Sequence, residues 1–304
     1  MLPIYKVTCN GSTINFGKRL ISLTISDESG FKSDKCEIVL DNQKGLINIP
    51  KTGSNLSVSM GYKESGVSYM GSYSVNEVAM SGPPSTLNIK CHAADFGSSL
   101  KEKISSSFEG STIGNLVKNI ASKYGLKPRV SNDFAGIVID HLDQTNESDM
   151  HLLTRLATQY GAITKPVNGN LLFAAKGLAK SISGLVLDET TLDLKDVISW
   201  NYTESILENY NKVKSEYIDF ENGETEENAD ENSPKSVENT MFRENNRSSR
   251  KIQITTLGNT NLVAESRVLL TGFQFEIPSN WIISRAEHSL NNQGFFTQIE
   301  CLQN

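Results

Sequence analysis

The segment that decides the fold runs from Leu56 to Tyr62 and reads LSVSMGY. Apolar side chains stand at every second position, and Ser or Gly stands between them. Such alternation is typical of a β-strand with one face on a core and the other toward solvent. Turn residues such as Gly82-Pro83-Pro84 separate it from similar segments, which favours a first antiparallel β-barrel over residues 1–96. Four other segments there share the pattern, each with its apolar residues in one phase: Tyr5, Val7 and Cys9; Leu23 and Ile25; Cys36, Ile38 and Leu40; Leu87, Ile89, Cys91 and Ala93.

The pattern changes to a helical period after residue 96. Ser111-Thr112 is a candidate N-terminal cap for a helix from Ile113 to Tyr124, whose apolar residues recur three and four positions apart. Gly125 follows as the expected left-handed C-terminal cap.

A second helix is predicted from about Ser148 to Tyr160, again followed by a glycine, Gly161. Residues 136–139, 163–167 and 171–174 read as strands, and Asn168-Gly169 predicts a tight hairpin between the last two. Residues 97–180 are therefore predicted to form a small α+β module between two β-domains.

Strand-like alternation resumes in residues 181–304, which predicts a second antiparallel β-barrel similar to the first. Its apolar phases are Val213, Ser215 and Tyr217; Ile252, Ile254 and Thr256; Trp281 and Ile283; Phe295, Thr297, Ile299 and Cys301. We expect a mobile insertion at about residues 219–249, because that segment has too little apolar content to form a core. It holds seven acids without Lys or Arg up to Glu231, namely Asp219, Glu221, Glu224, Glu226, Glu227, Asp230 and Glu231.

Composition excludes several classes of protein. The chain has 304 residues, of which 38% are hydrophobic, so it can form folded cores. The net charge of −6 opposes general or sequence-specific binding of nucleic acid, which needs a basic face. We expect neither export nor integral membrane association, since the first residues lack a signal-like pattern and no apolar window is long enough to span a bilayer.

The four cysteines lack the short paired spacings of a zinc site or a redox pair. Cys9, Cys36 and Cys91 fall on the apolar phase of predicted strands, and Cys301 does so in the second β-domain. They are predicted to be buried free thiols.

Possible ligands are densest between residues 140 and 151, where Asp140, His141, Asp143, Glu147, Asp149 and His151 occur. Their spacing matches neither a helical His-x-x-x-His motif nor a calcium loop. Glu147 and Asp149 fall at the start of the second predicted helix, where the exposed amides and the helix dipole favour carboxylates. We therefore interpret them as helix-start residues, with a metal-dependent hydrolase using Asp143, Glu147, Asp149 and His151 as the alternative.

Two other motifs are interpreted structurally. Residues 110–114, GSTIG, lack the Lys and the glycine spacing of a phosphate-binding loop and read as a capped helix start. His288 is predicted to be a partly buried residue that ties a strand to a loop. The sequence thus assigns no catalytic, cofactor-binding or metal-binding residue.

Three stretches of the chain carry a further signal in their order and spacing. The first is residues 20–41 with 93–96, the second is residues 112–121, 135–137, 143–157 and 169–173, and the third is residues 268–273, 281–283, His288 and 290–297. Together they resemble the late-control D family of temperate contractile-tail phages. The family is similar to the baseplate hub of T-even phages and to the hub half of type VI secretion spike proteins. Its members often carry a long basic insertion where residues 219–249 are acidic and short.

The resemblance implies a structural baseplate hub rather than an enzyme, without cofactors. It implies a homotrimer whose six barrels form a ring around a central channel and join a trimeric spike to the hexameric tail tube. The implied partners are the tail spike protein, the tail tube protein, other baseplate proteins and the tape-measure protein, and the implied location is the virion tail baseplate after assembly in the host cytoplasm. The hub of a type VI secretion or phage-derived bacteriocin particle is an alternative, since it would use the same fold.

Overall fold

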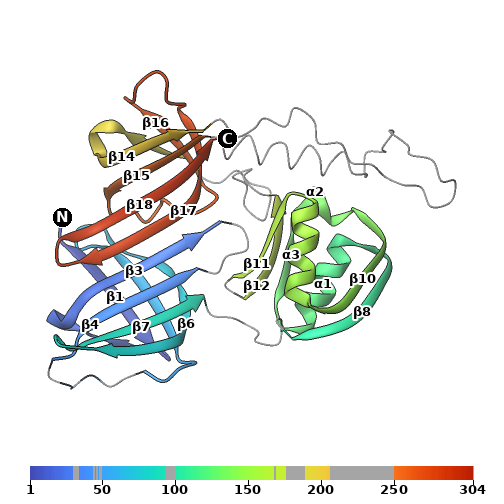
Figure 1. Ribbon diagram of the computed structural model, residues 1–304, viewed down its shortest axis with the longest axis horizontal. Helices are drawn as coiled ribbons and strands as arrows, with labels where there is room; N and C mark the ends of the chain where they lie inside the picture. The colour runs from blue at the N-terminus through green and yellow to red at the C-terminus, as the bar shows by residue number, and fades with distance from the viewer. Residues whose placement is uncertain are drawn as a thin grey trace.

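The computed structural model describes residues 1–29, 34–43, 45, 47, 50–93, 100, 102–167, 169–175, 189–205 and 250–303. Most of its strands gather in two curved groups, and the helices lie beside them in a third group that also contains β8 to β12 (Figure 1). The elements are β1 (Pro3–Cys9), β2 (Ser12–Ile14), β3 (Leu20–Glu28), β4 (Lys35–Asp41), β5 (Asn55–Tyr62), β6 (Gly66–Ser81), β7 (Thr86–Ala93), β8 (Lys103–Thr112), α1 (Ile113–Lys123), β9 (Lys127–Val130), α2 (Asn132–Ala135), β10 (Val138–Ser148), α3 (Asp149–Gln159), β11 (Ala162–Val167), β12 (Asn170–Ala175), β13 (Thr190–Asp193), β14 (Val197–Glu204), β15 (Arg250–Leu257), β16 (Arg267–Thr271), β17 (Asn280–Asn291) and β18 (Gly294–Gln303).

The largest sheet of the described chain contains 13 strands. Its order is β14-β15-β18-β17-β3-β4-β7-β6-β5-β1-β2, and β16 and β13 attach to it through β17. The pairings are antiparallel except for β13 with β16. The predicted strands at Leu56–Tyr62 and at the four similar N-terminal segments all lie in this sheet.

The predicted β-rich fold with few helices is confirmed, but the strands that the structure describes do not form two closed barrels. Instead, β17 pairs with β3 from Arg285 opposite Glu28 to Asn291 opposite Ser22, so the N-terminal and C-terminal strands form one continuous sheet. Alternation shows which face of a strand is apolar and says nothing about which strand lies beside it. The join between the two groups therefore had no signal in the sequence.

The long C-terminal hairpin contributes to both main cores of this sheet. Leu290 and Phe295, near its turn, pack with the buried residues of β1 and β3–β7. Further along the hairpin, Trp281, Ile299 and Cys301 belong to the second core, with residues of β13, β15 and β16. The boundaries 1–96, 97–180 and 181–304 stay predictions.

The α+β module has its own core between two small sheets. α1 and α3 pack with the antiparallel ribbon β8–β10 and with the sheet β11-β12-β9 (Figure 1). Both predicted helices are confirmed, with Thr112 capping α1 and Ser148 capping α3 through their hydroxyls. The glycines after them adopt the left-handed conformation, at φ +67° for Gly125 and +61° for Gly161.

Other predictions meet the structure in part. Cys36, Cys91 and Cys301 are buried free thiols, whereas Cys9 is half-buried. The predicted strand at Val213–Tyr217 and the insertion at 219–249 lie outside the described residues. Within the described chain, no helix is long and apolar enough to cross a membrane.

Candidate functional site

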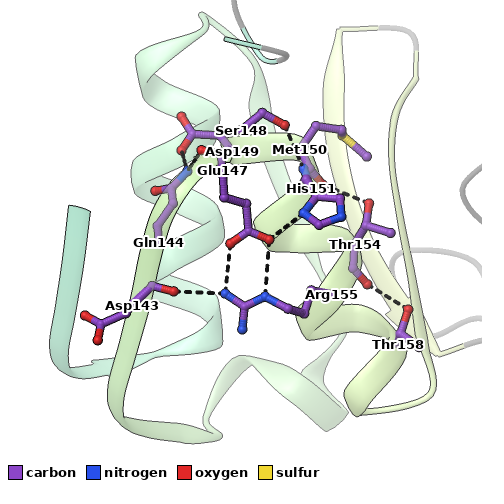
Figure 2. Close-up of polar contacts among 10 residues, drawn as sticks. All are labelled: Asp143, Gln144, Glu147, Ser148, Asp149, Met150, His151, Thr154, Arg155 and Thr158. Atoms are coloured by element: carbon purple, nitrogen blue, oxygen red, sulfur yellow. Dashed lines mark hydrogen bonds and ion pairs between the residues drawn. The ribbon is translucent and has the colours of Figure 1, made fainter. Parts of the chain in front are cut away.

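The predicted cluster of acids and histidines lies where β10 ends and α3 begins (Figure 2). The hydroxyl of Ser148 accepts a hydrogen bond of 3.2 Å from the backbone amide of His151, which satisfies one of the free amides of the first helical turn. The carboxylates on either side of Ser148 bond to side chains instead. Glu147 and Asp149 are thus at the helix start, as predicted, but the capping atom belongs to Ser148.

Asp149 joins three elements of the module. Its side chain is 2% exposed, and its Oδ2 accepts hydrogen bonds from the Lys123 ammonium at 2.8 Å and the Tyr124 hydroxyl at 2.6 Å. Its Oδ1 accepts from the Gln144 amide at 2.9 Å. Burial alone would raise the pKa of Asp149, but these hydrogen bonds outweigh it and lower the pKa below its ordinary value. Asp149 is therefore a buried charged brace between β10, α1 and α3.

Glu147 faces the other side of the junction (Figure 2). Arg155 donates to both carboxylate oxygens, at 3.2 Å to Oε1 and 2.9 Å to Oε2, and to the carbonyl oxygen of Asp143 at 2.9 Å. The Nδ1 of His151 lies 2.6 Å from Glu147 Oε1. The hydrogen bonds from Arg155 lower the pKa of Glu147, so this carboxylate is held ionised by a cation in the second turn of the helix.

Of the remaining predicted residues, His141 and Asp143 form an exposed group on the ribbon, and Asp140 is also exposed. His141 Nε2 lies 3.0 Å from Asp143 Oδ2, and His141 Nδ1 lies 3.8 Å from Glu109 Oε1 on the neighbouring strand. The hydrogen bond with His141 lowers the pKa of Asp143. The predicted cluster of acids and histidines is therefore divided into three separate sets of contacts, around Asp149, Glu147 and His141. In the part of the chain that the structure describes, no three His, Cys, Asp or Glu side chains converge as a metal site.

His288 is fully buried, where partial burial was predicted. Its Nδ1 lies 3.0 Å from the hydroxyl oxygen of Thr297 on β18, and that oxygen accepts a hydrogen bond of 2.9 Å from the backbone amide of Asn259. Burial lowers the pKa of His288 to about 4, and the backbone at Leu262 opposes the shift. His288 is therefore linked through Thr297 to a loop, in a setting that keeps the imidazole neutral.

One polar junction was missed by sequence reasoning. Lys165 on β11 donates to the backbone carbonyl of Glu28 and to Asp34 Oδ1, both at 3.2 Å, and lies 3.8 Å from Asp27 Oδ1. These contacts attach the α+β module to the main sheet. Burial and the nearby carboxylate of Asp34 raise the pKa of Asp27 to about 6. A lone lysine in a strand carries no signal of a partner more than a hundred positions away.

Two named relatives are similar to the chain. It is 29% identical to the probable baseplate hub protein of Escherichia phage 186, over 99% of this chain and 92% of that protein. It is 32% identical to the probable baseplate hub protein of Escherichia phage P2 over 198 residues, and the match spans 64% of this chain and about half, 51%, of that relative. No protein-family model matches the chain.

Solved structures share the fold. The 43 kDa tail protein of prophage MuSo2 from Shewanella oneidensis superposes with a TM-score of 0.75 at 16% identity, covering 99% of this chain and 98% of that one. A component of the type VI secretion system of E. coli superposes with a TM-score of 0.61 at 8% identity, covering 98% and 76%. With the relatives from phages 186 and P2, these matches confirm the predicted similarity of the chain to phage baseplate hub proteins.

Proposed function

We propose that this chain is the structural baseplate hub of a contractile phage-type tail. The observation that carries the proposal is the match with the probable baseplate hub protein of phage 186 along nearly the whole of both chains. The fold shared with a prophage tail protein, again over nearly full length, supports it.

The finer proposal is a trimeric adapter around a central channel. Each chain brings two groups of strands, so three chains bring six, and such a ring offers three equivalent contacts to a trimeric spike and six to a hexameric tube. Tail spike, tail tube, tape-measure and other baseplate proteins would then be its partners, in the virion baseplate after assembly in the host cytoplasm.

The role is proposed to be structural rather than catalytic. The carboxylates of Glu147 and Asp149 are both engaged in bracing contacts with cations, and the pKa of each is lowered. An ionised carboxylate that already accepts several charged hydrogen bonds is a poor general acid. Replacing Glu147 with Gln is therefore expected to leave tail function intact, whereas loss of a metal-dependent hydrolytic activity would favour the hydrolase alternative.

The test is the mass of the chain with its spike partner. We expect light scattering of the purified complex to show that this chain contributes three copies of 33.5 kDa, or about 100 kDa, in addition to the mass of the spike. A strict monomer in that complex would overturn the trimeric adapter. A baseplate position is tested separately, by labelling purified tails with antibody against the chain, and label absent from the tails would overturn the hub itself.

The hub of a type VI secretion or phage-derived bacteriocin particle is a second candidate. It is favoured by the fold shared with the E. coli secretion component, although identity is only 8%. Genes for capsid and terminase beside the coding gene would indicate a phage, and their absence would indicate a tail-like particle.

A further inference from the structure

The α+β module and the main sheet have separate cores. Among the described residues, the core of the module runs from Leu100 to Phe173 and shares no residue with the two cores of the main sheet. No described strand of the module pairs with a strand of the main sheet either. Two bodies joined in this way are expected to move relative to each other unless their interface is large and hydrophobic.

The face of β11 and β12 that carries Lys165 also carries a small apolar cluster. Ile163, Leu172 and Ala174 are buried there, and Leu172 lies directly opposite Lys165 in the pairing of the two strands. In the part of the chain that the structure describes, this cluster contains no residue of the main sheet. Apolar packing between described residues therefore does not join the module to the sheet.

Polar contacts of Lys165 join them instead. Within the described ranges, the hydrogen bonds and ion pairs found between the module and the main sheet all come from its ammonium group. This single ammonium meets two carboxylates, at 3.2 Å from Asp34 Oδ1 and 3.8 Å from Asp27 Oδ1. A contact made by one side chain can be broken while both bodies stay folded.

Backbone groups of the main sheet hold the two carboxylates in place. Asp27 Oδ2 accepts a hydrogen bond of 2.8 Å from the amide of Ala264, in the loop between β15 and β16. Asp34 Oδ1 accepts one of 3.2 Å from the amide of Glu28. Neither donor belongs to the module, so both hydrogen bonds would remain if the module moved away.

The other charged and titratable groups near this pair also belong to the main sheet. Burial and nearby negative charges, including those of the pair, raise the pKa of the Tyr73 hydroxyl on β6. Arg285 on β17 pairs instead with three other carboxylates, those of Glu28, Glu287 and Glu300. Among the described residues, Lys165 is therefore the cation that offsets the charge of the pair.

We propose that the α+β module is a movable unit, that Lys165 holds it against the main sheet at neutral pH, and that uptake of a proton by the Asp27–Asp34 pair releases it. The proton would sit in the hydrogen bond between the two carboxyl groups and remove half of the charge that attracts the ammonium. The proposal goes beyond the proposed hub function and does not depend on it.

Proton uptake and the contact with Lys165 oppose each other. Burial and the carboxylate of Asp34 raise the pKa of Asp27 to about 6, and the ammonium of Lys165 counteracts the rise. When the module leaves, the charge of Asp34 and the surrounding sheet remain but the cation is gone, so the pKa of Asp27 rises further. The released state thus binds the proton more tightly than the attached state, and release is favoured as pH falls through about 6.

The distance between two spin labels, measured by pulsed electron paramagnetic resonance on the full chain, tests the movement. Labels are attached at Lys118→Cys on α1 and Lys251→Cys on β15, both exposed, in a Cys9→Ser background because the other native thiols are buried. We expect one narrow distance at pH 8 and a second, broader population at pH 5, with the change centred near pH 6. The lower pH stays above the pKa of His288, which is about 4.

Variants of the junction separate this contact from general effects of acid. Lys165→Met should show the broad population at both pH values, whereas Lys165→Arg keeps the cation and should keep the narrow distance at pH 8. Asp27→Asn combined with Asp34→Asn imitates the neutralised pair and should release the module at pH 8. Glu77→Gln is the matched control, because it removes a carboxylate from an exposed ion pair with Lys90, and it should behave like the parent.

Exchanging the two charges gives a second measurement. Lys165→Glu alone should release the module at pH 8, and its combination with Asp34→Lys should restore the narrow distance. Amide exchange in β4, β5 and β7 checks that each variant keeps the main sheet folded. The same narrow distance at both pH values in the parent and in Lys165→Met would overturn the proposal, as would a broad distribution in the parent at pH 8.

Discussion

The hydroxyl of Tyr124 donates a 2.6 Å hydrogen bond to the buried carboxylate of Asp149, which ties the end of α1 to the start of α3. Replacing Asp149 with Asn removes the charged acceptor of Lys123, Tyr124 and Gln144 and leaves one oxygen to accept their hydrogen bonds. We expect a loss of about 2–3 kcal/mol in the free energy of unfolding, measured by urea denaturation. Glu109→Gln, at an 80% exposed side chain, is the control and should change stability by less than about 0.5 kcal/mol. Equal effects would contradict the bracing role.

Lys165 attaches the α+β module to β3, and its side chain is only 17% exposed. Lys165→Met keeps the length of the side chain and removes the charge, so Asp27 and Asp34 lose their shared cation. We expect a cost of about 1–3 kcal/mol, seen as faster amide exchange at the ends of β3 and β11. Lys195→Met removes an exposed lysine, 74% accessible, and should leave exchange unchanged. Unchanged exchange in Lys165→Met would mean that other contacts hold the module.

Asp27 should make stability depend on pH in an unusual direction for an acid. Its pKa is raised from 3.8 to about 6 by burial and by Asp34, so the folded chain binds this proton more tightly than the unfolded chain. Its contribution to stability therefore grows as pH falls from about 6 toward 4 and is lost as pH rises through 6. In Asp27→Asn this contribution disappears, which thermal melts of variant and parent between pH 4 and 8 would reveal. Parallel curves would refute the shift.

His288 should have the opposite effect on stability to Asp27 over nearly the same pH range. Burial lowers its pKa from 6.5 to about 4, so the unfolded chain takes up the proton first and stability is lost as pH falls from about 6.5 toward 4. Because Asp27 gains what His288 loses, the parent chain should show a shallow pH profile. His288→Gln should flatten the loss and expose the gain from Asp27. A variant whose profile stays as shallow as that of the parent between pH 4 and 6.5 would assign the effect elsewhere.

Local features of the fold were predictable because their chemistry is local. Thr112 and Ser148 cap helices with their own hydroxyls, and Gly169, at φ +74°, closes the hairpin between β11 and β12. The buried faces of β4, β5 and β7 were also predictable, because the alternation of apolar and polar residues in each strand shows which side chains face the core.

Long-range features were not predictable from these patterns. β8 carries few apolar residues and reads KISSSFEGST, yet it pairs along β10 for most of its length. The contact of β17 with β3 and the attachment of Lys165 depend on strands distant in sequence. At the helix start, residue type and position indicated Glu147 and Asp149, but only the packed structure separates the partners of one from those of the other.

The C-terminal hairpin has a consequence for the order of synthesis. The Tyr62 hydroxyl donates to the backbone carbonyl of Phe295, 233 residues later, and Leu290 and Phe295 fill the same core as Val7 and Leu23. The ribosome makes the N-terminal strands long before the residues that complete their core. That core can close only after translation has passed Phe295, so during synthesis the apolar faces of the early strands stay without their last packing partners.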